Sequence, residues 1–144
     1  MTVMKEVMIK ITGQQISRDA GEDTMEFVTE AKLYSRGGSL YLLYDESELS
    51  GIPGCRTRLR FKDGTVQLKR YGEGTGLGSE ISFEKGKRYT GLYDTPVGPL
   101  EIEILTNELE NTLSEEGKGQ LDIDYSVSLK GLTEGRNRLN ITMM

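Results

Sequence analysis

Residues 55–71, CRTRLRFKDGTVQLKRY, decide the fold class, because apolar and polar side chains alternate on both sides of one glycine turn. A period of two places successive side chains on opposite faces of a β-strand. The apolar face of the first segment consists of Cys55, Thr57, Leu59 and Phe61, and the cationic face consists of Arg56, Arg58, Arg60 and Lys62. Asp63-Gly64 is typical of a type I′ turn. The stretch therefore predicts a tight antiparallel hairpin.

The same alternation recurs on both sides of this hairpin and predicts most of the remaining strands. These strands are expected at 7–12, 25–33, 39–44, 81–83, 89–95, 100–106, 121–129 and 138–143. Residues 107–116 are the one segment whose pattern favours a short helix. About nine or ten short strands separated by turns are typical of a sandwich or a barrel. We expect an all-β protein that forms a single, closed or nearly closed antiparallel barrel, with the short helix near 107–116.

Length and composition predict one domain over residues 1–144. A chain of 144 residues has the usual size of a single domain, and 28% charged with 35% hydrophobic residues is typical of a folded globule. No apolar run approaches the ~20 residues that cross a bilayer. The first residues, MTVMKEVMIK, include charges where a signal peptide needs an apolar segment. Because Cys55 is the only cysteine, no internal disulfide can form, which suits a reducing compartment. We expect a cytoplasmic protein.

The absence of histidine excludes many kinds of active site. Ser-His-Asp and Cys-His nucleophile systems, His-containing zinc sites and the usual general base near neutral pH all need this residue. No motif indicates a catalytic residue, a cofactor or a metal. An enzyme built on Asp, Glu, Tyr, Lys or a recruited metal is therefore the least favoured function. The net charge of −5 argues against broad nucleic-acid binding, although it leaves room for a local basic patch.

From Leu68 to the C-terminus the order of several short motifs resembles a known family. The residues that carry it are Arg70 and Gly72 in LKRYG, Phe83-Glu84-Lys85-Gly86, Tyr93-Asp94-Thr95, Gly98, Thr106, Gly119, Asp124-Tyr125, Asn137, Leu139 and Ile141. They resemble the uncharacterised YwiB-like family, a domain-of-unknown-function group with a calycin-like, lipocalin-related barrel. The resemblance implies a barrel of about eight to ten strands, which can be solid or can hold one small ligand. It implies no activity, substrate or catalytic residue.

Arg70 is the most unusual position in the pattern, because it shares strand parity with Val66 and Leu68 on the expected inner face. Burying a guanidinium is unfavourable unless the group is paired and hydrogen-bonded. One interpretation is an arginine that fills the barrel and bonds to carbonyls or an acid, or a strand end at which parity has drifted. The other is an anion-binding group at the barrel mouth. The tyrosines expected to accompany it in a wet cavity are Tyr89, Tyr93 and Tyr125.

The basic face of residues 56–62 is the second candidate site. We define its arginines, Arg56, Arg58 and Arg60, as the basic strip. One interpretation is a solvated outer face neutralised by acids on neighbouring strands, such as Glu101 with Glu103 and Asp122 with Asp124. The other is a patch for an anionic partner or RNA, against which we count the lack of interleaved aromatic residues. The same acid pairs could form a glycosidase dyad or a metal site, but a solvated face is the favoured interpretation.

Two functions remain after these exclusions. The favoured one is a barrel that binds a small anionic or amphipathic molecule through Arg70 and the tyrosines. The alternative is a solid barrel that acts as a protein- or nucleic-acid-interaction module through the basic strip. We expect a small-molecule ligand as partner, leave a homodimer open, and expect neither a membrane nor, from the net charge, a nucleic acid.

Overall fold

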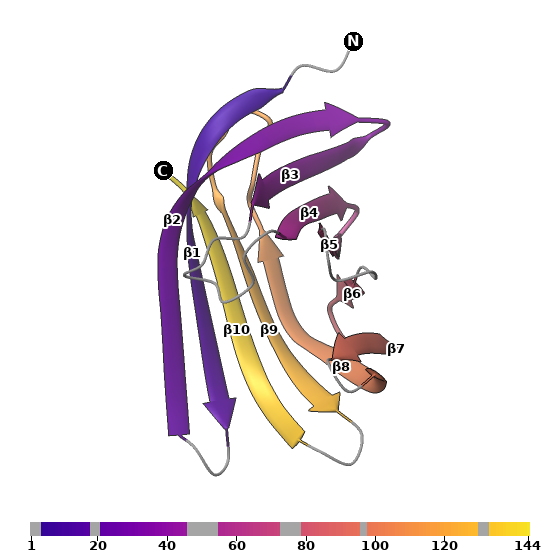
Figure 1. Ribbon diagram of the computed structural model, residues 1–144. Coiled ribbons are helices and arrows are strands. Elements are labelled where there is room, and N and C mark those ends of the chain that lie inside the picture. The colour runs from indigo at the N-terminus through magenta and orange to yellow at the C-terminus, as the bar shows by residue number, and fades with distance from the viewer. Residues whose placement is uncertain (1–3, 18–20, 46–54, 73–78, 96–97, 130–132) are drawn as a thin grey trace.

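The computed structural model describes residues 4–17, 21–45, 55–72, 79–95, 98–129 and 133–144 (Figure 1). Nearly all of them lie in strands, and the described part contains no helix. The strands are β1 (Lys5–Ser17), β2 (Gly21–Arg36), β3 (Ser39–Asp45), β4 (Cys55–Lys62), β5 (Thr65–Gly72), β6 (Ser79–Glu84), β7 (Arg88–Thr95), β8 (Gly98–Asn111), β9 (Gln120–Leu129) and β10 (Thr133–Met143). The prediction of an all-β protein is confirmed.

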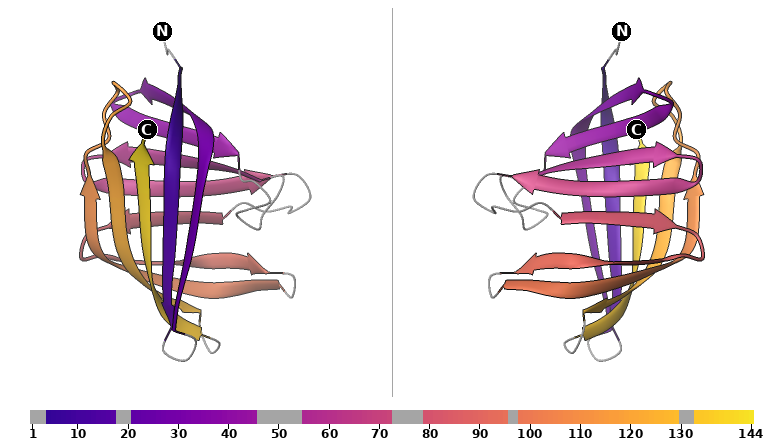
Figure 2. Two further views of the ribbon diagram at one scale, coloured as in Figure 1. Left: turned by 90° about the vertical axis from the view of Figure 1, so that its left-hand side faces the viewer. Right: turned by 90° about the vertical axis from the view of Figure 1, so that its right-hand side faces the viewer.

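The ten strands form one antiparallel sheet in the order β6-β5-β4-β3-β2-β1-β10-β9-β8-β7. Figure 2 shows β3 to β7 running nearly across the direction of β1, β9 and β10, so that the sheet curls around a shared interior. Its two edges, β6 and β7, meet without a backbone ladder. The Tyr89 hydroxyl, on β7, donates a hydrogen bond of 2.7 Å to the Glu80 carbonyl on β6. The nearly closed barrel that the sequence predicts is therefore confirmed, with a seam between β6 and β7.

The β4–β5 hairpin agrees with its prediction in detail. Lys62 lies opposite Thr65, and the two residues between them are Asp63, with a φ of 48°, and Gly64, with a φ of 78°. A type I′ turn needs positive φ at both central positions, which Asp and Gly adopt most readily. The pairing puts the apolar residues of both strands on one face and the basic strip on the other.

The predicted short helix near 107–116 is wrong. Residues 107–111 continue β8, which pairs with β9 as far as Asn111 opposite Leu121. Glu108, Leu109 and Glu110 alternate with period two, and Leu109 packs against the core. The register shifts between Thr106 and Glu108, as expected of a β-bulge with one extra residue. This bulge interrupts the alternation, which explains why the segment did not resemble a strand.

The core lies inside the curled sheet and is mainly aliphatic. Side chains that are fully or almost fully buried include Ile9, Ile11, Leu33, Leu42, Leu59, Val66, Phe83, Ile104, Leu121, Ile123 and Ile141. Burial decreases along the inner face toward the β1–β2 and β9–β10 hairpins, at the bottom of Figure 1, where Met25 is 39% exposed and Asn137 and Val127 are part-exposed. The inner face is therefore tightly packed around the core and more exposed at the end near these hairpins, which we call the open end. None of the described residues belongs to a helix that could cross a bilayer.

Candidate functional site

Arg70 lies on the inner face of the barrel. Its Cα is opposite Thr57, which is fully buried, and it follows Val66 and Leu68 of the core on the same face of β5. Its Nε atom is buried, and its charge is close enough to Tyr125 on β9 to influence that phenol. The barrel thus brings together two predicted site residues that are 55 positions apart in the chain. A cation and a phenol on one inner surface can bind an anion and hydrogen-bond to it.

Tyr125 occupies a mixed environment between the apolar core and the polar end. Its ring packs against the ring of Phe83 on β6, with centroids 5.0 Å apart and planes tilted by 59°. Burial raises the pKa of Tyr125, and a hydrogen bond with the Asn137 side chain and the charge of Arg70 oppose this rise. The phenol therefore stays protonated near neutral pH. It can donate a hydrogen bond as well as accept one.

Two threonines on the inner face are completely buried but differ in their bonding. Thr57, on β4, is 0% exposed and has an interaction partner. Thr106, on β8 opposite Tyr125, is 1% exposed, and its Oγ1 has no hydrogen-bond partner among the described residues. A buried hydroxyl without a partner is unfavourable by about 1–3 kcal/mol. Thr106, Tyr125 and Arg70 form what we call the inner polar cluster.

The other two predicted tyrosines have different positions. The Tyr89 hydroxyl closes the seam through its bond to Glu80, and a Cβ at Gly91 would come within 2.9 Å of its oxygen, so the ring lies over a glycine. Tyr93 lies on β7 opposite Leu100, at the same strand parity as Tyr89, but its side chain is outside the described residues. The Tyr89 hydroxyl proton is thus used within the wall of the barrel, which leaves the ring and the acceptor capacity of the oxygen.

The basic strip lies on the outer face of β4, but its three arginines have different partners. Arg56 forms an ion pair with Asp45 at 2.9 Å. The guanidinium of Arg58 lies over the Tyr41 ring, 5.6 Å from its centroid. Arg60 donates hydrogen bonds to the Ser39 hydroxyl at 3.1 Å and to the Gln67 side chain at 3.3 Å. β4 itself has no aromatic residue on this face, as predicted, but the neighbouring strand β3 adds Tyr41 beside Arg58.

Two of the four acids expected beside the basic strip pair with arginines elsewhere on the barrel, whereas Arg56 has its acidic partner, Asp45, on the neighbouring strand β3. Glu103 pairs with Arg88 on β7, and Asp124 pairs with Arg136 on β10, on another part of the barrel. Asp124 is 8% exposed rather than solvated, and it also accepts a hydrogen bond from Asn107 at 3.3 Å. The Arg136 hydrogen bond is the main reason that the pKa of Asp124 is lowered, although burial opposes it.

Two further acids on this part of the barrel also have protein partners. The Asp122 carboxylate accepts a hydrogen bond from the Asn140 amide, and Glu108 pairs with Lys85. Among the described residues no group of three or more His, Cys, Asp or Glu side chains could hold a metal ion. These acids therefore have structural partners within the outer face of the barrel.

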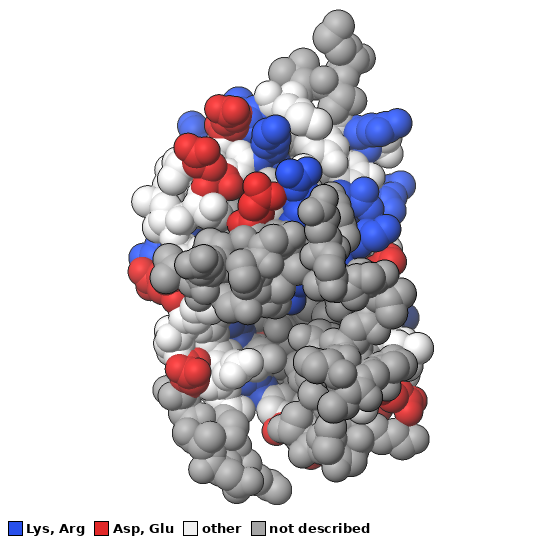
Figure 3. All heavy atoms as spheres, in the orientation of Figure 1, with Lys and Arg blue, Asp and Glu red and all other residues white. Residues whose placement is uncertain are grey.

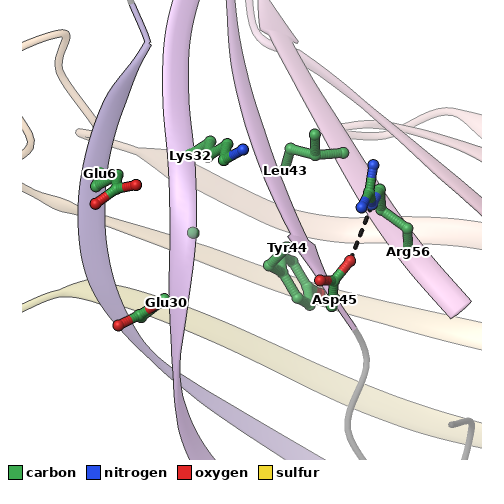
Figure 4. A pocket seen from close by; sticks show the side chains of 8 residues that line it. Glu6, Glu30, Lys32, Leu43, Tyr44, Asp45 and Arg56 are labelled. Carbon is green, nitrogen blue, oxygen red and sulfur yellow. Dashed lines mark hydrogen bonds and ion pairs between the residues drawn. The ribbon is translucent and has the colours of Figure 1, made fainter. Parts of the chain in front are cut away.

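Several shallow pockets open on the outer surface. Figure 4 shows one of about 140 Å³, where the Arg56–Asp45 ion pair forms one side and Glu6, Glu30 and Lys32 extend from neighbouring strands. Two larger grooves of about 470 and 450 Å³ lie over β8, β9 and β10, near Asp124 and its arginine partners. Because charges of opposite sign line all three, none of them selects clearly for one kind of charged ligand. The inner polar cluster and the surface around Arg58 remain the two candidate sites.

Residues 9–141 match a family of protein domains described as "Domain of unknown function (DUF1934)". The chain belongs to the DUF1934 family. Among solved structures, the ywiB protein from Bacillus subtilis is similar to it, with 23% identity and a TM-score of 0.74 over 97% of this chain and 93% of that one. The comparison shows a shared fold, and the predicted YwiB-like resemblance is confirmed. No curated protein matches the DUF1934 chain.

Sequence reasoning missed several residues of both candidate sites in this DUF1934 barrel. Thr106 and Asn137 share strand parity with Ile104 and Leu139, so the alternation alone could have assigned them to the inner face. Tyr34 and Tyr41 lie beside the basic strip through the β2–β3 hairpin register, in which the two residues are directly opposite. The signal for this pairing was the Arg36-Gly37-Gly38 turn, which sets the register of the hairpin.

Proposed function

We propose that this DUF1934 barrel binds a small anionic or amphipathic molecule at the open end of its interior. The observation that carries the proposal is the inner polar cluster, in which the Arg70 charge acts on Tyr125 and the Thr106 hydroxyl has no hydrogen-bond partner among the described residues. Arg70 would bind the anionic group of the ligand, and Tyr125 and Thr106 would hydrogen-bond to its polar atoms. The apolar part of the ligand would contact the part-exposed residues near Met25 and Val127.

The chemistry of the cluster favours an anion over a neutral or cationic ligand. The Arg70 cation is one of the groups that shift the pKa of Tyr125, so the cluster contains a positive charge beside a phenol. A charge in a poorly solvated interior interacts more strongly with an opposite charge than the same charge on the surface does. A carboxylate, sulfonate or phosphate would therefore gain most from this position.

The proposal includes two features that the sequence suggested. A barrel with one packed end and one open end would hold its ligand in the manner of a calycin, to which the family resemblance points. The reducing compartment expected from the lone cysteine would be the cytoplasm. Tyr89 would act indirectly, because its bond to Glu80 holds the seam of the barrel closed.

The proposal can be tested by titration with 8-anilinonaphthalene-1-sulfonate, an anionic apolar dye whose fluorescence rises in a dry site. We expect saturable binding of one dye per chain and competition by decanoate. Arg70→Met should weaken binding tenfold or more, because a hydrogen bond to a charged group contributes about 1.5–3 kcal/mol. Lys69→Met is the matched control, since this neighbouring cation is exposed on the outer face of the same strand.

Three results would contradict the proposal. The dye could fail to saturate, Lys69→Met could weaken binding as much as Arg70→Met does, or decanoate could leave the dye in place. Urea unfolding of both variants, monitored in the absence of dye, separates a loss of folding from a loss of the binding group. If Arg70→Met unfolds early, Arg70→Lys provides the second test, because it keeps the charge but loses the planar donor set.

A further inference from the structure

The second candidate site lies on the outer face of β2, β3 and β4 and is independent of the barrel interior. Its centre is a pocket of about 260 Å³ near the β2–β3 turn. The pocket is lined by Tyr34, Arg36, Gly37, Tyr41, Arg58 and Arg60. In Figure 3, Lys and Arg side chains gather at the upper right of the visible face, on the side where β3 and β4 lie in Figure 1. Aromatic and basic residues thus share one concave surface.

The aromatic part of this surface is an ordered stack. The rings of Tyr34 and Tyr41 lie 4.9 Å apart between centroids, with planes only 9° from parallel, and the Arg58 guanidinium lies over the Tyr41 ring. The β1–β2 ladder ends at Lys5 opposite Leu33, so Tyr34 lies just beyond the end of this ladder, where it lines the pocket. A flat aromatic group can therefore extend the stack at Tyr34. Stacking of a base on an aromatic side chain is tolerant of base identity.

The charges of this surface are unusual for the protein. Among the described residues Arg36, Arg58 and Arg60 form no ion pair with a carboxylate, and Arg60 is held by the neutral side chains of Ser39 and Gln67. Arg56, Arg88 and Arg136, by contrast, each pair with an acid. In a chain with a net charge of −5, three arginines around one pocket form a local site for an anion.

From this juxtaposition we propose that the outer pocket binds a nucleotide, with the base stacked on Tyr34 and the phosphate held by Arg36, Arg58 and Arg60. The pocket volume suits a single nucleotide unit. The ligand can thus be a free nucleotide or one unit of a single strand. A duplex does not fit, since its bases are already stacked on one another.

The test is fluorescence anisotropy with a labelled eight-nucleotide poly(A) RNA at 50 and 200 mM salt. The protein should bind it, with an affinity that falls steeply as salt rises. Arg58→Gln and Tyr34→Leu should each weaken binding tenfold or more, and Tyr34→Phe should restore it. Arg88→Gln is the control, because this arginine is paired with Glu103 elsewhere on the barrel and should bind as the wild type does.

Competition identifies the source of the nucleotide. If AMP displaces the labelled RNA at an equal concentration of nucleotide units, the proposed pocket is supported and its ligand is a free nucleotide. If only unlabelled single-stranded RNA displaces it, the pocket is also supported and its ligand is a single strand. The proposal is overturned if no salt-dependent binding occurs, if an RNA duplex of the same length binds as well, or if Arg88→Gln weakens binding as much as Arg58→Gln. The Arg58→Gln protein should bind the dye at the interior site as the wild type does. A loss of RNA binding at the outer pocket is therefore distinguishable from a loss of dye binding at the interior site.

Discussion

The two buried threonines of the inner face offer a sharp test of the interior structure, because the same substitution should change stability in opposite directions. Valine has nearly the shape of threonine and replaces the hydroxyl by a methyl group. At Thr106 it removes a buried Oγ1 that has no hydrogen-bond partner in the part of the chain that the structure describes. At Thr57, which is equally buried and has a partner, it removes a favourable interaction.

The magnitudes follow from the burial and the bonding of each hydroxyl. A buried unsatisfied group destabilises by about 1–3 kcal/mol, so Thr106→Val should raise the free energy of unfolding by at least about 1 kcal/mol. A net hydrogen bond contributes about 1 kcal/mol, so Thr57→Val should lower the free energy of unfolding by that amount or more. For a chain of this length 1 kcal/mol corresponds to roughly 3 °C in Tm. The two variants should therefore melt about 6 °C or more apart.

Urea unfolding and calorimetry without ligand measure both effects. A fall in stability for Thr106→Val would refute the reasoning, because it would mean that the hydroxyl has a bonding partner such as an ordered water. The same variant also tests the proposed function. If Thr106 contacts the ligand, Thr106→Val should be more stable alone yet gain less stability from decanoate than the wild type gains.

Three further predictions concern the frame around the sites. Gly119→Ala should lower the free energy of unfolding by about 3 kcal/mol, because φ is +105° and a Cβ would lie 2.1 Å from the Thr112 carbonyl oxygen. Gly37→Ala, at φ +59° with no atom close to the added Cβ, should lower it by about 1 kcal/mol, and urea unfolding compares the two variants. Because the pKa of Asp124 is lowered in the folded protein, its contribution to stability is complete above its ordinary pKa of 3.8 and is lost as pH falls through the lowered pKa. Asp124→Asn should therefore be less stable than the wild type at pH 6, and its stability should fall less on acidification. Urea titrations at several pH values measure both effects. Gly91→Ala should displace the Tyr89 ring and lose about 1 kcal/mol, and Tyr89→Phe should lose a similar amount, with the double variant losing less than the sum.

Alternation and turn chemistry were enough to predict the strands, the β4–β5 hairpin and the inward parity of Arg70. These features depend on residues within one strand or one turn, and a period of two is unambiguous when one face is buried. The segment after Thr106 was predicted wrongly because the bulge at Asn107 inserts one residue and shifts the pattern. A single extra residue reverses which face each following side chain occupies.

The partners of charged residues were the least predictable feature. Glu103 and Asp124 were expected to neutralise the basic strip, yet they pair with Arg88 and Arg136 on the adjoining strands. Strand order determines this choice, because an ion pair across a ladder needs side chains on neighbouring strands. The sequence shows which face a charge occupies, but it does not show which strand lies beside it.

Both candidate sites combine residues from several neighbouring strands. A horizontal layer takes one residue from each strand, so Thr106, Tyr125 and Asn137 lie side by side on β8, β9 and β10 although the chain separates them widely. The outer stack has the same construction, since Tyr34 is opposite Tyr41 and Tyr41 is opposite Arg60 on the next strand. The inner face is therefore polar in the layer of Thr106, Tyr125 and Asn137, although the rest of it is aliphatic. The outer face near the β2–β3 turn is aromatic and basic. A substitution in one layer can alter its site and leave the strands intact, which makes the interior and outer sites separable by experiment.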